Sequence, residues 1–185
     1  RDIFEPEGKK LEAQVKFSPS EEAEMAGMNL EQILHYTASK LSFVSIPWTY
    51  NSTVAGKQFD DSKTWRLFHM SYIVFDEQNK IQTKLYPHFK PILDRIEGDK
   101  LLRIKCNLFP NTEIVYEHAA HYDFLKSHKT ALLSINTCDG YTTLEDGTKI
   151  DSIENRMLKF DGSSMHKSST TSNQTVRMNV NISYE

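Results

Sequence analysis

The second half of the chain alternates short strand-like runs with turn signals, and this pattern limits the possible folds more than any other feature of the sequence. From residue 101 onward the runs are LLRIKCNLF, TEIVYEHAAHYDF, TALLSIN, GYTTLED, NRMLKFDG and TVRMNVNISY. Dipeptides that favour turns separate them: Pro110-Asn111, Asp139-Gly140, Asp146-Gly147, Asp161-Gly162 and Ser172-Asn173. Strands at this spacing predict an all-β sandwich or jelly roll.

The first hundred residues have a different texture. Helical signals occur at 18–27 and 30–41, and extended runs at 43–51 and 65–75. A further helix is predicted over 86–98, with Pro91 near its start and Gly98 capping its end. We expect one mainly β (α+β) domain over 1–185. Residues 1–100 would form a helical and β support, and 101–185 the core strands that carry the site.

Composition excludes several classes of protein. Hydrophobic residues make up 38% of the 185 residues and charged residues 25%, an ordinary globular balance. The net charge of −3 and the lack of a basic run argue against a protein whose main function is to bind nucleic-acid phosphates. No apolar run approaches the ~20 residues of a membrane span, and the polar first residues do not predict a secretory signal. Cys106 and Cys138 form no CxxC pair, which suits a reducing cytoplasm.

The stretch HAAHYDF, residues 118–124, concentrates polar side chains. As a helix it would place His118 and His121 on one face, but this is not the HExxH spacing of zinc proteases. As a strand it would place His121 and Asp123 on one face and His118 on the other. The preceding Ile114-Val115-Tyr116 favours the strand. His121-x-Asp123 then offers an imidazole and a carboxylate to one metal ion, and His118 is expected to be structural.

Two further residues extend this pattern. His166 follows the turn FDGSSM, and Arg177 stands eleven residues later in TVRMNVNIS. Alternation in that last run predicts an apolar face and a polar face, and Arg177 and Asn179 lie on the polar one. An inward-pointing arginine needs an anion, because an unpaired buried charge is very costly. A ligand carboxylate is one candidate; pairing with a nearby Asp or Glu, or extension into solvent, are the others.

Together, HxD, a distal histidine and a later arginine resemble the Fe(II)/2-oxoglutarate dioxygenases. The order of pieces resembles the prolyl-4-hydroxylase-like branch, including small phage-encoded members. The likeness runs from about Leu101 to Tyr184. NTCDGYTTLEDG is similar to that family's Asn-turn-Gly-x-Thr connection, and RMLKFDGSSMH to the strand and turn before its distal histidine. The first hundred residues match only loosely, as a support.

The resemblance implies a double-stranded β-helix (jelly roll) core and a ligand set. His121, Asp123 and His166 would bind Fe(II) and leave three positions open for 2-oxoglutarate and O2. Arg177 would receive the far carboxylate of 2-oxoglutarate through two parallel N–H bonds. The further expected cosubstrate contacts are Asn179, Tyr116, Asn107 and Thr142. Ser134 stands where many relatives carry a tyrosine that binds 2-oxoglutarate, so that contact would be weaker or supplied by Tyr116.

The implied activity is hydroxylation of an unactivated C–H bond, coupled to decarboxylation of 2-oxoglutarate to succinate and CO2, with ascorbate as a possible reductant. Peptidyl proline is the first substrate guess. A protein, a peptide or a small molecule is the expected partner, in the cytoplasm (the host's, for a phage-encoded chain). Three alternatives stay open: an oxygenase acting on a small molecule or free amino acid, a nucleic-acid demethylase, and a cupin-like metal-binding module without turnover. Demethylation fits poorly, because Ser183 stands where that branch carries a second arginine.

Overall fold

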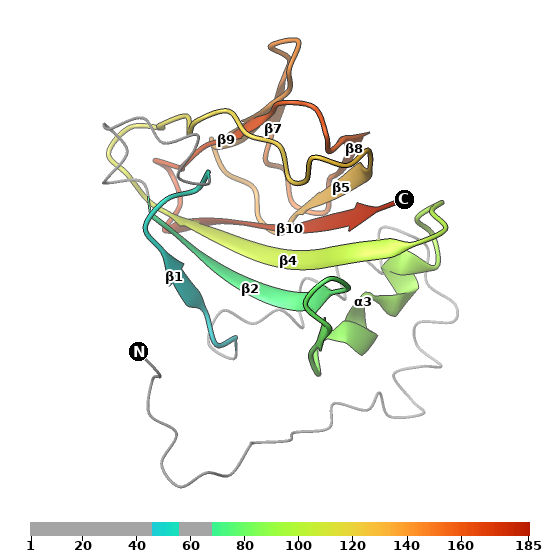
Figure 1. The fold of residues 1–185 in the computed structure, drawn as a ribbon. Helices are drawn as coiled ribbons and strands as arrows, with labels where there is room; N and C mark the ends of the chain where they lie inside the picture. The colour runs from blue at the N-terminus through green and yellow to red at the C-terminus, as the bar shows by residue number, and fades with distance from the viewer. Residues whose placement is uncertain (1–45, 56–67) are drawn as a thin grey trace, which may run out of the picture.

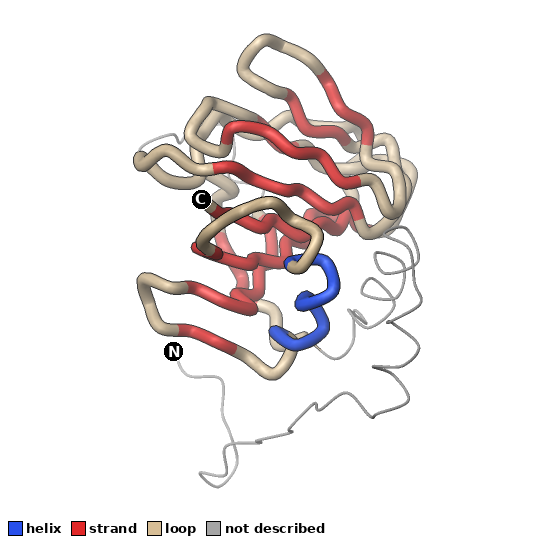
Figure 2. The backbone as a smooth tube through the Cα atoms, turned by 90° about the vertical axis from the view of Figure 1, so that its right-hand side faces the viewer, coloured by secondary structure: helices blue, strands red, loops and turns tan. Residues whose placement is uncertain are grey.

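The computed structural model describes residues 46–55 and 68–185, which form a mainly antiparallel β structure with one described helix. Figures 1 and 2 show the strands stacked in layers, and in Figure 1 the helix lies at the lower right. The helices expected at 18–27 and 30–41 lie outside the described residues. Among the described residues, no helix has the length and apolar character that crossing a membrane requires.

The main sheet has the strand order β1-β2-β4-β10-β5-β8, with β3 paired to β2. The bounds of its strands are β1 Thr49–Asn51, β2 His69–Asp76, β3 Ile81–Gln82, β4 Leu101–Pro110, β5 Lys129–Ser134, β8 Met157–Asp161 and β10 Val176–Tyr184. All pairings in it are antiparallel. Because β2 pairs with β4, the main sheet reaches back into the first hundred residues. The one-domain organisation over 1–185 stays a prediction.

The second sheet is smaller and has the order β7-β6-β9. Its strands are β6 Tyr141–Thr143, β7 Lys149–Asp151 and β9 Lys167–Ser168. The predicted strand TEIVYEHAAHYDF is wrong as a continuous strand: this segment is extended but irregular, and single bridges join Glu117 to Ser169 and His121 to His166. These bridges attach the segment to the second sheet beside β9.

The apolar core lies on one face of the main sheet. Ile104 and Cys106 of β4 and Val180 and Ile182 of β10 are buried there. Helix α3, Tyr86–Leu93, covers this face. Each fully buried aliphatic or aromatic side chain stabilises the fold by roughly 1.5–3 kcal/mol. The apolar face that alternation predicts for the last strand, β10, therefore packs against α3.

Helix α3 is shorter than predicted. It ends at Leu93 with Asp94 as its C-cap, and Pro91 lies inside it rather than near its start. Gly98 does not cap it: a Cβ added at Gly98 would stand 2.3 Å from a ring carbon of Tyr184. This glycine permits close approach of the last strand. Its role is packing, which helical periodicity could not reveal.

The opposite face of the main sheet is polar and yet buried. Four polar residues of β10 lie on the face opposite the apolar core and are buried: Arg177, Asn179, Asn181 and Ser183. Burying so many polar groups is costly unless they bond to one another or to a ligand. The space between the two sheets is therefore the candidate location of a functional site.

Candidate functional site

His121 and His166 are placed side by side by the backbone itself. Their main chains form a bridged pair, with His121 N donating to the His166 carbonyl at 2.9 Å and His166 N donating to the His121 carbonyl at 2.8 Å. Directly opposed residues in such a pair bring their side chains close together. The two ring centroids are 4.7 Å apart, and His166 is buried.

Both imidazoles are oriented by the same local hydrogen bond. The Nδ1 atom of His121 lies 3.1 Å from the carbonyl oxygen of Ala119, and that of His166 lies 3.0 Å from the carbonyl of Ser164. A neutral ring that donates through Nδ1–H keeps its lone pair on Nε2. Burial and the neighbouring His166 lower the pKa of His121, which favours the neutral, metal-binding form.

Asp123 lies beside the two imidazoles and is held from several sides. Arg103 Nη2 donates to its Oδ1 at 2.8 Å, and Asn181 Nδ2 donates to its Oδ2 at 2.9 Å. Burial opposes ionisation of this carboxyl, but Arg103 and His166 outweigh it and lower the pKa of Asp123. Asp123 Oδ2 is 3.9 Å from Nε2 of His166.

The three side chains supply the right donors for a divalent ion but are not closed around one. In the described part of the chain, no three His, Cys, Asp or Glu side chains stand in a metal-binding arrangement. Ligands bound at 2.0–2.2 Å and at right angles lie about 3 Å apart, so the 3.9 Å gap between Asp123 and His166 exceeds this by about 1 Å. Side-chain rotation spans such a distance, so the donor set fits a two-histidine, one-carboxylate centre.

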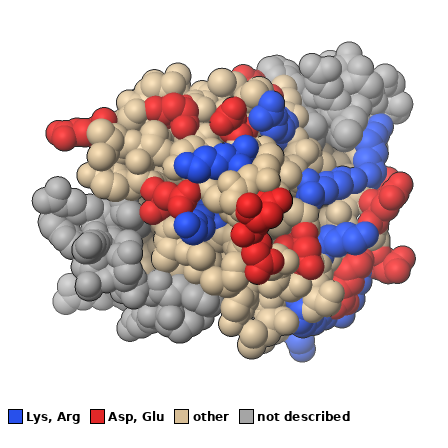
Figure 3. Space-filling model, turned by 90° about the horizontal axis from the view of Figure 1, so that it is seen from above, with Lys and Arg blue, Asp and Glu red and all other residues tan. Residues whose placement is uncertain are grey.

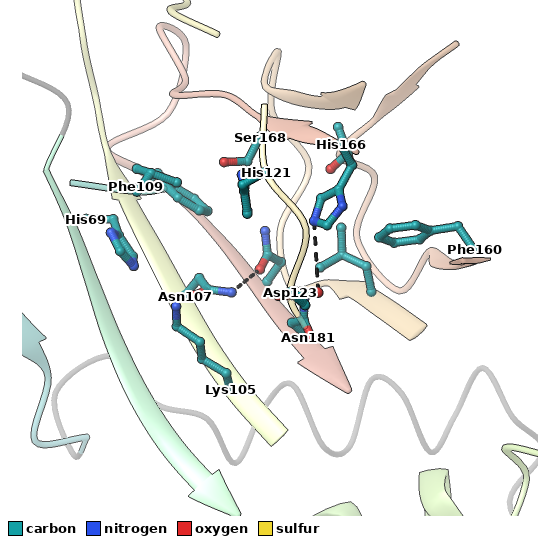
Figure 4. Close-up of a pocket in the computed structure, with 14 residues that line it drawn as sticks. His69, Lys105, Asn107, Phe109, His121, Asp123, Phe160, His166, Ser168 and Asn181 are labelled. Carbon is teal, nitrogen blue, oxygen red and sulfur yellow. Dashed lines mark hydrogen bonds and ion pairs between the residues drawn. The ribbon is translucent and has the colours of Figure 1, made fainter. Parts of the chain in front are cut away.

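The three side chains line one pocket between the sheets (Figure 4). Three of the expected cosubstrate contacts, Asn107, Thr142 and Asn179, line it as well, and Asn107 Nδ2 donates to Asn179 Oδ1 at 3.0 Å. The cavity volume is about 50 Å³, and a cavity of about 10–15 Å³ on the same measure holds one water molecule. The pocket therefore has room for a few water molecules before any lining side chain moves.

Other expected contacts lie elsewhere. Tyr116 is 43% exposed and is not among the described lining residues, because it belongs to the irregular segment rather than to an inward-facing strand. Ser134 is buried on β5 opposite Asn179. His118 is buried and bonded through Nδ1 to Ser168 Oγ at 2.8 Å. Trp48 packs against the apolar core.

Arg177 is almost fully buried, and its guanidinium has only neutral partners among the described residues. Nε donates to Ser152 Oγ at 2.6 Å, Nη1 to the Ser169 carbonyl at 3.0 Å, and Nη2 to Thr142 Oγ1 at 3.0 Å. Burial lowers its pKa to about 10. Gly140 leaves room for it, since a Cβ there would lie 2.6 Å from Arg177 Cδ. Arg177 thus stands directly behind Thr142, at one end of the pocket.

Several lining residues escaped the sequence reasoning. Lys105 projects from β4 on the same face as Asn107, and alternation within RIKCNLF could have found it. His69 of β2 and Phe160 of β8 also line the pocket, but no local sequence signal marks them. Ser152 and Ser169 were missed as partners of Arg177 for the same reason.

Comparisons with known proteins bear on the fold. No protein-family model matches the sequence, and no curated protein matches it. A prolyl hydroxylase from Trichoplax adhaerens, solved with a hypoxia inducible factor oxygen degradation domain peptide fragment, is 14% identical. It aligns with a TM-score of 0.52 over 86% of this chain and 80% of that one.

Two other solved structures are more distant. A Pseudomonas putida prolyl-4-hydroxylase is 10% identical, with a TM-score of 0.44 over 82% of this chain and 98% of that one. A cupin domain from Bordetella pertussis is 14% identical, with a TM-score of 0.36 over 49% and 88%. At these identities the likeness speaks for the fold alone. The predicted fold class is confirmed: the chain is mainly β and has a jelly-roll architecture.

Proposed function

We propose that this chain is an Fe(II)- and 2-oxoglutarate-dependent dioxygenase that hydroxylates an unactivated C–H bond. The supporting observation is the meeting of His121, Asp123 and His166 in the lining of one pocket, with both imidazole Nδ1 atoms engaged by carbonyls. Two imidazoles and one carboxylate leave coordination positions open, as an iron oxygenase requires. Iron and 2-oxoglutarate, when bound, supply the oxidising chemistry, with release of succinate and CO2.

The protein's own groups have separable roles in this proposal. His121 and His166 hold the ion through Nε2, and Asp123 does so through the oxygen that Asn181 now contacts. The Oδ1 atom of Asp123 stays on Arg103, which favours a carboxylate bound through one oxygen. Arg177 and Thr142 mark the end of the pocket for the far carboxylate of 2-oxoglutarate.

Peptidyl proline is the first substrate to test, because the Trichoplax neighbour is a prolyl hydroxylase solved with a peptide. A nucleic-acid substrate has less support. On the face seen in Figure 3, lysine and arginine side chains are interspersed with aspartate and glutamate rather than gathered in a basic patch.

A metal-binding module without turnover is the second candidate, and one observation favours it. All three guanidinium nitrogen atoms of Arg177 already donate to protein oxygens. An arginine satisfied in this way has less to gain from a cosubstrate carboxylate.

Turnover separates the two candidates. With Fe(II), ascorbate and oxygen, the protein should convert 2-oxoglutarate to succinate even without its prime substrate. EDTA should stop this reaction and added Fe(II) restore it, while Asp123→Ala should be inactive. A protein that binds Fe(II) tightly but forms no succinate above the Asp123→Ala background is a binding module, and the proposal is then wrong.

A further inference from the structure

Lys105 occupies a distinct place in the pocket. It lies on β4, on the polar face of the main sheet, directly opposite Asn181 of β10. It lines the same pocket as His121, Asp123 and His166 (Figure 4). Asn181 in turn donates to Asp123. Lys105 therefore lies at the same end of the two strands as Asn181, which contacts Asp123.

Its amine is the pocket cation without a direct protein partner in the described structure, although the residue is partly exposed. Arg103 pairs with Asp123 at 2.8 Å, and Arg177 donates to three oxygens. Within residues 46–55 and 68–185, Lys105 Nζ forms no hydrogen bond or ion pair. Burial and the nearby Arg103 lower the pKa of Lys105 to about 8, although Asp123 acts in the other direction.

The balance of charge around the pocket points to an anion. Among the described residues, Lys105 and Asp123 are the charged groups that line it. Arg103 and Arg177 stand behind the lining and bond to Asp123 and Thr142. Three cations are thus in or behind the pocket, with one carboxylate. A divalent metal adds two positive charges and 2-oxoglutarate removes two, so a positive excess persists in a low-dielectric site. A further anionic group would lower that cost.

Arg177 and Lys105 leave the main sheet at opposite ends of the pocket. Along β4 and β10 the facing pairs run from Arg177 opposite Phe109, through Asn179 opposite Asn107, to Asn181 opposite Lys105. Four residues of strand separate the outer pairs, about 13 Å at the usual rise. The Arg177 end suits the tail of the cosubstrate, which leaves Lys105 for a second molecule beside the metal.

We propose that Lys105 binds a carboxylate of the prime substrate, so that the enzyme acts on small carboxylic acids such as free amino acids rather than on internal peptide residues. This inference rests on the proposed oxygenase function and replaces peptidyl proline with free acids as the substrate class. A neutral prolyl peptide brings no charge to this position, whereas a free acid forms an ion pair with the amine next to the reacting centre.

The test combines labelling and stability. The probes are the free L-amino acids, each paired with its C-terminal amide. Wild-type protein, metal-free and loaded with Fe(II) and 2-oxoglutarate without oxygen, is exposed to acetic anhydride, and acetylation of Lys105 is followed by peptide mass spectrometry. At least one free acid should slow acetylation of Lys105 fivefold or more in the loaded protein and raise its melting temperature, and the matching amide should do neither.

Variants assign the effect to this side chain. Lys105→Met should lose the stabilisation by that acid and Lys105→Arg should keep part of it. Lys129→Met, which removes an exposed lysine of β5, should behave as wild type. Binding of Fe(II) and 2-oxoglutarate is measured in both Lys105 variants, so that loss of the acid site is distinguished from loss of the oxygenase site.

Three results would overturn the inference. One is equal protection by an acid and its amide, or protection by none of the acids. Another is stabilisation by the acid that survives in Lys105→Met. The third is a Lys105→Met variant whose only defect is weaker 2-oxoglutarate binding, since the amine would then serve the cosubstrate. If the wild type fails to bind iron and 2-oxoglutarate at all, the proposed function fails, and labelling of the metal-free protein still reports whether Lys105 binds acids.

Discussion

At the scale of single residues, Asp123 is the group on which the candidate centre depends. Its two oxygens have different partners: Oδ1 meets Arg103, and Oδ2 meets Asn181 and lies 3.3 Å from Thr130 Oγ1. The guanidinium of Arg103 is itself held over the ring of Phe124, 4.4 Å from the centroid. This arrangement keeps the carboxyl ionised and orients it toward the histidines.

Removing Arg103 should make metal binding more sensitive to acid. In Arg103→Met the pKa of Asp123 should rise, because an adjacent opposite charge normally lowers an aspartate by 1–3 units. Protons then compete with the metal at higher pH. The pH at which half of the Fe(II) affinity is lost should increase by roughly one unit, measured by anaerobic titration across pH.

A matched variant controls for loss of any surface ion pair. Lys167→Met removes a 2.7 Å pair with Glu117 on the same extended segment, outside the described pocket lining. It should leave the acid midpoint where it is. Equal midpoints for Arg103→Met and wild type would show that Arg103 does not set the ionisation of Asp123.

Arg177 should govern the cosubstrate rather than the metal. Arg177→Lys keeps the charge but cannot reproduce three directed N–H bonds. Losing a charged hydrogen bond costs about 1.5–3 kcal/mol, so the KM for 2-oxoglutarate should rise about ten- to hundredfold while Fe(II) affinity is unchanged. Arg156→Lys, at an exposed arginine bonded to the Asp151 carbonyl, is the control. An unchanged KM in Arg177→Lys would place the anchor elsewhere.

The sequence predicted the face shared by His121 and Asp123 although the segment is not a regular strand. Extended backbone alternates its side chains whether or not a ladder forms. Tyr116 does not line the pocket as expected, because the segment is irregular before it reaches the histidines. The partners of Arg177 could not be predicted from the sequence, because Ser152 and Ser169 belong to chain segments that only the tertiary fold brings together.

At the scale of elements, the main sheet separates two environments. One face packs on α3, whose Phe89 and Ile92 are fully buried, and the other carries the polar site. The alternation in β4 and β10 predicts both faces. It does not predict the length of α3, which ends at Leu93, where the chain continues in tighter turns: Arg95 N donates to the Ile92 carbonyl and Ile96 N to the Leu93 carbonyl.

Shortening one buried side chain of α3 should test the packing of this helix on the main sheet. Ile92→Ala should lower the free energy of unfolding by about 2–5 kcal/mol, through lost burial and the cavity left behind. Urea unfolding with an unchanged slope is the measurement. Lys90→Ala, which removes only an exposed pair with Asp94, should change stability by less than about 0.5 kcal/mol. Comparable losses in the two variants would contradict the packing assignment.

At the scale of the whole molecule, two buried histidines link folding to pH. His69 and His118 flank the ring of Phe109, with centroids 5.7 and 5.2 Å from it. Burial lowers the pKa of each to about 3, with Lys105 contributing at His69 and Arg177 at His118. Both rings are neutral in the folded protein at pH values where the unfolded chain is protonated.

Stability should therefore fall as pH falls from about 6.5 toward 3. In this window the unfolded state binds more protons than the native state, so each histidine contributes a slope of up to ~1.4 kcal/mol per pH unit. The double variant His69→Gln and His118→Gln should show a shallower slope between pH 6.5 and about 4.5 in urea unfolding, even if its stability at neutral pH is lower. An unchanged slope would mean that these rings do not account for the acid sensitivity.

The central claim is that His121, Asp123 and His166 bind one iron together with 2-oxoglutarate, and anaerobic absorption spectroscopy tests it most directly. Adding Fe(II) and 2-oxoglutarate to the wild type should produce a weak visible charge-transfer band that saturates at one iron per chain. His166→Ala should lose the band, and His118→Ala, at a buried histidine outside the described lining, should keep it. A wild type without the band, or a His166→Ala variant that retains it, would contradict the account.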